Sequence, residues 1–113
     1  MEKLYVGWEQ FDEMVHELKE MIPEGKYGKL YGVPRGGLTI AVRLSHLTGI
    51  PMDSIIPNRK ILVVDDIADS GKTLEGYDSF DTATLFYKAT SSKKPTYFVD
   101  ETDKWVVFPW ENP

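Results

Sequence analysis

Residues 61–74, which read ILVVDDIADSGKTL, limit what this chain can fold into more than any other stretch. Residues 61–64 form a continuous apolar run, which is typical of a strand buried on both faces of a parallel sheet. Asp65 and Asp66 follow where this strand is expected to end, and residues 67–73 form a short loop before a predicted helix. Ligands of open α/β sheets bind at the carboxyl ends of strands, so this segment predicts a ligand site.

The same loop offers groups that bind a phosphate. Gly71 lies in a turn before the predicted helix, where free backbone N–H groups and the positive end of the helix dipole attract an anion. Ser70 and Thr73 add hydroxyl donors, while Asp65 and Asp66 are suited to ribose hydroxyls or to a hydrated metal ion. The segment therefore predicts a ligand that carries both a phosphate and a sugar.

Composition agrees with a single soluble domain over residues 1–113, since hydrophobic residues make up 42% of the chain and charged residues 27%. A net charge of −5, with no basic run longer than Lys93-Lys94, argues against a surface that coats nucleic acid. The chain has no cysteine, which excludes disulfides and thiolate metal sites. It shows neither a signal peptide nor an apolar run long enough to span a membrane, and this indicates a cytoplasmic protein.

Apolar periodicity predicts strands that alternate with helices. The predicted strands are residues 4–6, 29–33, 61–64, 83–87 and 96–99, the last at a sheet edge, and the predicted helices are residues 11–22, 38–48 and 74–80. His16 on the first helix is expected to be solvated or half-buried rather than a ligand.

A second glycine turn, Pro34-Arg35-Gly36-Gly37, joins the predicted strand 29–33 to the following helix. Glycines let the backbone approach anionic oxygens closely, and the Arg35 guanidinium presents a planar, permanently charged fork. A simple tight turn is the alternative for this motif taken alone. Two turns of this kind, each after a strand and before a helix, favour an anion-binding edge of the sheet.

The run VVDDIADSGKT resembles the phosphoribosyl pyrophosphate signature of type I phosphoribosyltransferases, in which two acids and two spacers precede Asp-Ser/Thr-Gly-x-Thr. The spacing of a Walker A loop is absent. VPRGG resembles the pyrophosphate turn of that family, where a cis peptide bond is common and would here join Pro34 to Arg35. The resemblance implies a Rossmann-like α/β fold with a mainly parallel sheet flanked by helices. Residues 100–113, with the N-terminus, would form a small hood.

The resemblance also implies a role for each motif residue. The 5-phosphate would be bound by Asp69, Ser70, Gly71, Lys72 and Thr73. Pyrophosphate would be received by Arg35, Gly36 and Gly37. The acids Asp65 and Asp66 would hold the ribose hydroxyls and Mg²⁺, with Glu111 as a further metal ligand in some relatives. Asp69 would be the catalytic base that takes a proton from the imidazole ring of the purine.

Lys88 and the C-terminal tail resemble the purine members of the family, namely the xanthine-guanine and hypoxanthine-guanine phosphoribosyltransferases. In these, a lysine at the end of the strand after the signature donates to the exocyclic oxygen of a 6-oxopurine. Trp105 is the expected stacking residue, and the backbone of Val106 is expected to read the base edge. A solvated lysine and ordinary core packing of the tryptophan are the alternatives.

The implied function is Mg²⁺-dependent transfer of ribose 5-phosphate from phosphoribosyl pyrophosphate to guanine, xanthine or hypoxanthine. The products are pyrophosphate and the nucleoside monophosphate, and the family is commonly dimeric or tetrameric. Which purine is preferred does not follow from the sequence.

One segment departs from the family pattern, in which a long loop between the second and third core strands closes over the substrate. Here only residues 57–60 separate residues 52–56 from residue 61, and adjacent parallel strands need a crossover of about a dozen residues. Residues 52–56 are therefore not expected to pair with residues 61–64. Either this segment is naturally shortened or a loop is missing from the sequence. A non-catalytic purine-nucleotide-binding module on the same fold is thus the alternative function, and an unrelated doubly wound binding protein is a third.

Overall fold

The structure, a computed structural model, describes residues 2–53 and 60–111. In chain order its elements are β1 (Lys3–Tyr5), α1 (Trp8–Met21), β2 (Lys29–Gly32), α2 (Gly36–Thr48), β3 (Ile61–Val64), β4 (Ile67–Ala68), α3 (Lys72–Glu75), β5 (Asp81–Tyr87), β6 (Tyr97–Glu101), β7 (Trp105–Val107) and the 3₁₀ helix η1 (Pro109–Glu111). No helix within the described part of the chain is both long and apolar enough to cross a lipid bilayer.

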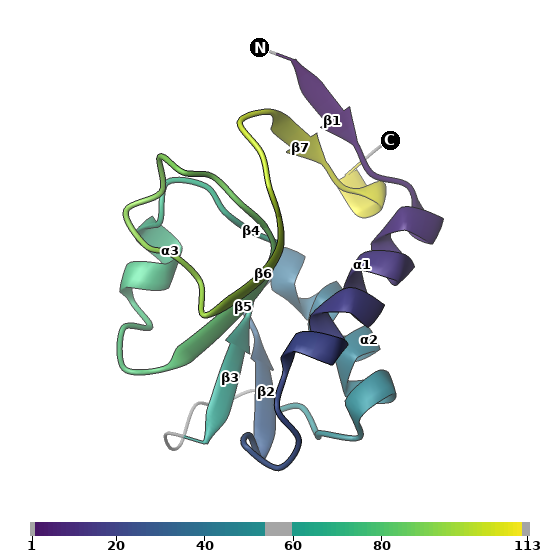
Figure 1. Cartoon of the computed structure of the whole chain (residues 1–113), viewed down its shortest axis with the longest axis vertical. Coiled ribbons are helices and arrows are strands. Elements are labelled where there is room, and N and C mark those ends of the chain that lie inside the picture. The colour runs from purple at the N-terminus through teal and green to yellow at the C-terminus, as the bar shows by residue number, and fades with distance from the viewer. Residues whose placement is uncertain (1, 54–59, 112–113) are drawn as a thin grey trace.

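The main sheet has five strands, and all of its pairings are parallel. β3 lies between β2 and β5, β4 pairs with the later part of β5, and β6 pairs with the other edge of β5. Helices α1 and α2 lie together on one side of this sheet, and α3 lies on the other (Figure 1). The predicted α/β fold with a parallel sheet flanked by helices is confirmed.

Burial of β3 explains its unbroken apolar run, because all four of its side chains are buried. Leu62 and Val64 belong to the large core cluster under α1 and α2, whereas Ile61 and Val63 pack in a second cluster with Val33. Cover on both faces accounts for the apolar residue at each of the four positions of β3.

The two long helices agree with the prediction from apolar spacing. The buried stripe of α1 contains Phe11, Met14, Val15 and Leu18. His16 lies on the exposed side of this helix, where its Nδ1 is 2.8 Å from the Asp12 carbonyl oxygen. Gly49 ends α2 with a φ of 78°, a left-handed conformation that glycine adopts without steric cost.

The predicted helix over residues 74–80 is wrong, because α3 spans only Lys72–Glu75. Beyond it the amides of Gly76, Tyr77 and Phe80 each donate to the carbonyl three residues earlier, which makes a series of turns. Gly76 and the polar residues that follow it favour such turns over a continued helix. The chain consequently reaches β5 at Asp81, two residues earlier than predicted.

Met52 forms an isolated parallel bridge with Leu30 and therefore lies on the outer side of β2. It does not neighbour β3, whose partners are β2 and β5, as expected from the short connection. Residues 54–59, which include most of the segment predicted to be shortened, lie outside the described residues.

Two short strands from opposite ends of the chain form a separate parallel sheet, β1 with β7 (Figure 1). Aromatic contacts attach this sheet and η1 to the rest of the molecule: the rings of Phe108 and Trp110 stack with centroids 4.9 Å apart, and Trp110 meets Phe11 of α1 edge-on at 5.5 Å. Residues 100–101, which were predicted within the hood, belong to β6 instead. The small β1–β7 sheet lies beyond the carboxyl ends of β4 and β5 (Figure 1).

Candidate functional site

The Arg35 turn, residues 34–37, lies directly against the end of β3. The Val33 amide donates to the Val64 carbonyl at 2.8 Å, and the peptide bond between Pro34 and Arg35 is cis, as predicted. A side chain at Gly36 would overlap the carboxylate of Asp66, so the backbone of the turn and this acid are in close contact. The absence of a side chain at Gly36 is what lets this carboxylate approach the backbone of the turn.

Asp65 and Asp66 lie where β3 ends and the chain shifts into β4. The Asp65 amide donates to Ala83 O of β5 at 3.0 Å, and the Asp66 carbonyl accepts from the amides of both Leu85 and Phe86. Two residues of β5 thus face one carbonyl, as in a β-bulge, which re-aims side chains at this point. The bulge brings both carboxylates to the sheet edge that the Arg35 turn also occupies.

The acid pair is held in a buried environment. Burial, followed by the charge of Asp66, raises the pKa of Asp65 to about 8. Burial also raises the pKa of Asp66, to which the Glu111 charge adds, while hydrogen bonds to the Asp66 carboxylate oppose the rise. The raised pKa values mean that the ionised forms of the two carboxyls are disfavoured in the free protein. A cation or hydrogen-bond donors from a ligand would stabilise these ionised forms.

These carboxylates fit a Mg²⁺ ion. Mg²⁺ is a hard cation that proteins usually bind through one or two carboxylates, with phosphate oxygens and water completing the octahedron. Among residues 2–53 and 60–111, no group of three or more His, Asp or Glu side chains is arranged to enclose a metal. The donor set of Asp65 and Asp66 therefore fits a metal that is shared with a phosphate-bearing ligand. Glu111 acts on Asp66 only through its charge, and its Oε1 accepts the Phe108 amide at 2.9 Å.

We expect the stability of the free protein to fall as pH rises from about 4 to about 8, through the contribution of Asp65. The folded state, with the higher pKa, binds this proton more tightly than the unfolded chain does, so the stabilisation is complete below the unfolded value and is lost as the carboxyl ionises. Asp65→Asn should remove this pH dependence. Urea denaturation at about pH 5 and pH 8.5, without divalent cations, measures the free energy of unfolding of the wild type and of Asp65→Asn. An equal loss of stability in both proteins between these pH values would contradict the prediction.

The signature loop, residues 69–73, borders a cavity of about 210 Å³ that is also lined by Asp65 and Asp66. Gly71 has a φ of 91°, and the Ser70 hydroxyl accepts the Lys72 amide at 3.3 Å. The helix dipole expected from the sequence is small, because α3 has a single turn. Anion binding in this cavity would thus depend on backbone amides and hydroxyl groups of the loop.

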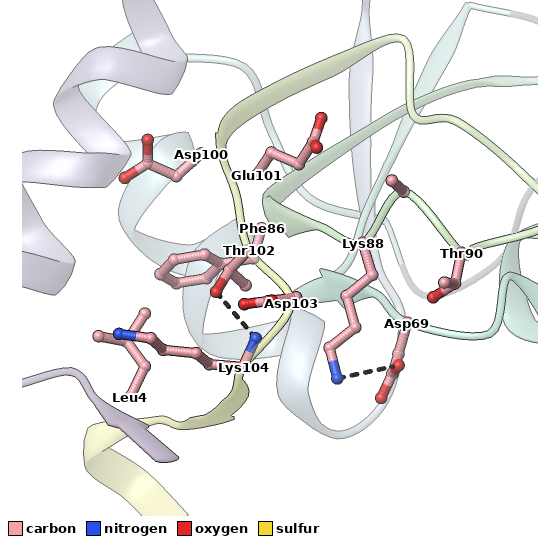
Figure 2. A pocket seen from close by; sticks show the side chains of 11 residues that line it. Leu4, Asp69, Phe86, Lys88, Thr90, Asp100, Glu101, Thr102, Asp103 and Lys104 are labelled. Carbon is pink, nitrogen blue, oxygen red and sulfur yellow. Dashed lines mark hydrogen bonds and ion pairs between the residues drawn. The ribbon is translucent and has the colours of Figure 1, made fainter. Parts of the chain in front are cut away.

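A larger cavity of about 800 Å³ adjoins the loop and contains Lys88 in its wall (Figure 2). Lys88 is only 7% exposed, and its Nζ lies 3.3 Å from Asp69 Oδ1 and 5.8 Å from the centroid of the Trp105 ring. The Lys88 amide donates to Ala68 O at 3.0 Å, which sets Asp69 and Lys88 side by side at adjacent strand ends. The alternative of a solvated lysine is therefore wrong.

Trp105 is 52% exposed, so the alternative of ordinary core packing is wrong as well. Val106 is buried. The Trp105 amide donates to Glu2 O, and Val107 O accepts from Val6, so both residues turn their peptide groups toward β1. Along a strand the N–H and C=O groups of successive residues point to alternate sides. The N–H and C=O of Val106 therefore point away from β1, toward the opposite edge of β7.

Other residues of the larger cavity were not predicted individually, although residues 100–104 lie within the predicted hood. They are Leu4, Phe86, Ala89, Thr90, Asp100, Glu101, Thr102, Asp103 and Lys104. Most of them come from the connection between β6 and β7 and from the residues just after Lys88 (Figure 2). They carry no motif, and only the pairing of β7 with β1 brings that connection over the end of β5.

Asp69 lines both cavities, and Asp66 both lines the smaller cavity and meets Gly36 of the Arg35 turn. The Arg35 turn, the acid pair, the signature loop and Lys88 therefore form one continuous site along the carboxyl edge of the sheet. Such a site suits an elongated ligand with an anionic group at each end and a planar group beside Lys88.

Comparisons with known proteins agree with this geometry. The family model for the phosphoribosyl transferase domain matches residues 34–113. The xanthine-guanine phosphoribosyltransferase of Roseobacter denitrificans is 39% identical over 57 residues, which cover 45% of this chain and 32% of that protein. The match thus spans about a third of that curated relative.

Solved structures resemble nearly the whole chain. A purine phosphoribosyltransferase from Pyrococcus horikoshii superposes with a TM-score of 0.88 at 37% identity, and the match covers 99% of this chain and 96% of that chain. The xanthine-guanine-hypoxanthine phosphoribosyltransferase of Helicobacter pylori gives a TM-score of 0.84 at 28% identity, covering 96% and 92%.

Proposed function

Because the chain belongs to the phosphoribosyl transferase domain family, we propose that it is a purine phosphoribosyltransferase. It would transfer ribose 5-phosphate from phosphoribosyl pyrophosphate to a 6-oxopurine. The observation that carries this proposal is the position of Asp69, which lines both the smaller cavity and the larger one. The purine-specific names of the similar proteins support it. Family membership rules out the third candidate, an unrelated doubly wound protein.

Phosphoribosyl pyrophosphate would bind across the acid pair. Asp69, Ser70, Gly71 and Thr73 line the smaller cavity, where amides and hydroxyls are the available donors. Together with Lys72, which does not line it, they would hold the 5-phosphate. Asp65 and Asp66 would hold the ribose hydroxyls and Mg²⁺. Arg35 and the amides of Gly36 and Gly37 would receive the pyrophosphate, which the contact between Gly36 and Asp66 supports.

The reaction breaks the bond between the anomeric carbon and a pyrophosphate oxygen, and it forms a bond from that carbon to a purine nitrogen. Positive charge develops on the sugar, so placement of the reactants and charge stabilisation should supply most of the rate enhancement. The purine proton would pass to the Asp69 carboxylate. Mg²⁺ bound at the acid pair would neutralise charge on the pyrophosphate oxygens.

The purine would lie in the larger cavity. The Lys88 ammonium is a donor without acceptor capacity, so it favours an exocyclic oxygen over an amino group. The exposed ring of Trp105, 5.8 Å from Lys88 Nζ, offers a face for stacking, and the Val106 peptide groups would read the base edge. We further propose that the protein is cytoplasmic and forms a homodimer or homotetramer; light scattering of the purified protein tests the oligomeric state.

A non-catalytic purine-nucleotide-binding module is the second candidate. The short connection between Met52 and β3 favours it, because a lid that excludes water contributes to catalysis in many enzymes. The two candidates share their ligands and differ only in turnover.

Pyrophosphate release separates these candidates. With phosphoribosyl pyrophosphate and Mg²⁺, we expect release with at least one of guanine, xanthine and hypoxanthine, and little with adenine. Calorimetry should show guanosine monophosphate bound about tenfold or more tightly than adenosine monophosphate, since a hydrogen bond to a charged group contributes about 1.5–3 kcal/mol. Lys88→Met should abolish this preference.

Nucleotide binding without pyrophosphate release would favour the binding module. A preference for the adenine nucleotide would contradict the role of Lys88, and Lys104→Met, on the same cavity wall but paired with Glu2, is the matched control.

A further inference from the structure

We propose that Ser92 and Glu75 are positioning residues that hold the Ser70–Gly71 peptide in its phosphate-binding orientation. Ser92 belongs to the connection between β5 and β6, residues 88–96, and Glu75 is the last residue of α3. The Ser92 hydroxyl donates to Glu75 Oε2 at 2.5 Å. This inference rests on the proposed function, because it takes the signature loop as the 5-phosphate site.

The β5–β6 connection packs tightly against the back of the signature loop. The Ser92 amide donates to Ser70 O at 2.9 Å. A β-carbon at Gly71 would overlap the Ser92 hydroxyl and would lie 2.7 Å from the amide nitrogens of Ser92 and Lys93. The loop and the connection therefore touch along the backbone, with no room for a side chain between them.

The bond to Ser70 O determines where a neighbouring donor points. In a trans peptide the N–H lies opposite to the carbonyl, so a Ser70 carbonyl directed at Ser92 turns the Gly71 N–H away from it. Gly71 lines the smaller cavity, whereas Ser92 does not. The contact with Ser92 thus aims a backbone donor at the place where the 5-phosphate would bind.

Glu75 closes the arrangement from the other side. Its amide donates to Gly71 O at 3.0 Å, and its carboxylate accepts the Ser92 hydroxyl. Three hydrogen bonds therefore form a ring: Ser92 N–H to Ser70 O, Glu75 N–H to Gly71 O, and Ser92 Oγ to Glu75. The Ser70 and Gly71 carbonyls each accept one of these bonds, from the amides of Ser92 and Glu75. The bond between the Ser92 hydroxyl and the Glu75 carboxylate links these two donor residues.

The connection that carries Ser92 is itself well ordered by internal bonds. The Ser91 amide donates to Lys88 O at 2.8 Å, and the Ser91 hydroxyl donates to Lys93 O at 2.7 Å. Ser92 is thereby linked to Lys88 and to the end of β5. A support of this kind holds the loop more rigidly than the single turn of α3 would alone.

The test compares binding of guanosine monophosphate with binding of guanosine, because only the nucleotide carries the 5-phosphate. In Ser92→Ala and in Glu75→Ala we expect the nucleotide affinity to fall about fivefold while guanosine affinity changes less than about twofold. Ser92→Thr and Glu75→Gln keep a donor or an acceptor at the same place and should retain wild-type affinity. Isothermal calorimetry with Mg²⁺ present measures all four variants.

Asp78→Asn is the matched control, because it removes an ion pair to Lys93 on the same connection without touching the signature loop. Unchanged nucleotide affinity in Ser92→Ala, or equal losses for nucleotide and nucleoside, or the same loss in Asp78→Asn, would each overturn the proposal. If the wild-type protein itself did not prefer the nucleotide, the 5-phosphate assignment in the proposed function would fail as well. A wild-type preference that Ser92→Ala leaves intact would refute the positioning role alone.

Discussion

Asp69→Asn is expected to slow nucleotide formation by about 100-fold to 10,000-fold, the usual contribution of a positioned proton acceptor. The Asp69 carboxylate lies 3.3 Å from Lys88 Nζ at the junction of the two cavities. Asparagine has nearly the same shape and can still accept a hydrogen bond from Lys88, but its amide oxygen does not take up a proton near neutral pH. Pyrophosphate release at saturating substrate concentrations measures the effect.

Binding of guanosine monophosphate to Asp69→Asn should stay within about threefold of wild type, since no proton is transferred on binding and Lys88 keeps a partner. Asp103→Asn is a suitable control, because Asp103 lines the same cavity and has no ion pair with Lys88 among the described residues. Its turnover should remain within about twofold of wild type, as for most substitutions away from reacting groups. If turnover and affinity fall together in Asp69→Asn, or if neither changes, Asp69 is not the proton acceptor.

The parts of this site that the sequence predicts are those whose cause is local. Ile61–Val64 had to be a doubly buried strand because no position in it is polar, and the acids that follow had to lie at a strand end. The Arg35 turn was also predictable from local sequence, because its glycines lie between a predicted strand and a predicted helix. Parallel order then brings both turns to one edge of the sheet.

Contacts between distant segments determine the features that the sequence did not predict. The Lys88 amide bonds to Ala68 O of a neighbouring strand, and Gly71 packs against Ser92, which carries no motif. Pair contacts of this kind leave no pattern in a single sequence. The short length of α3 has instead a local cause, the turns that begin at Gly76, which apolar periodicity alone did not reveal.

Gly37→Ala is expected to destabilise the protein by about 3 kcal/mol, because overpacking against rigid atoms is costly. In most helices the same change would stabilise by about 0.5–1 kcal/mol, so the sign of the effect is informative. Here a β-carbon at Gly37 would overlap Val64 O and would lie 3.0 Å from Asp65 Cα and 3.1 Å from Val64 C. All three are backbone atoms at the end of a fully buried strand, and none can rotate away. Thermal denaturation should show a midpoint lowered by about 10 °C.

Substitutions at two other glycines serve as controls, because they distinguish an effect on stability from an effect on ligand binding. Gly28→Ala should change stability by less than about 0.5 kcal/mol, because nothing lies within 4 Å of the added carbon. In Gly36→Ala the three atoms nearest the added carbon all belong to the Asp66 side chain, which can turn aside. The fold should therefore persist while affinity for phosphoribosyl pyrophosphate and Mg²⁺ falls. Wild-type stability in Gly37→Ala would mean that the Arg35 turn does not lie against the end of β3. The Arg35 turn and the acid pair would then be too far apart to share one ligand.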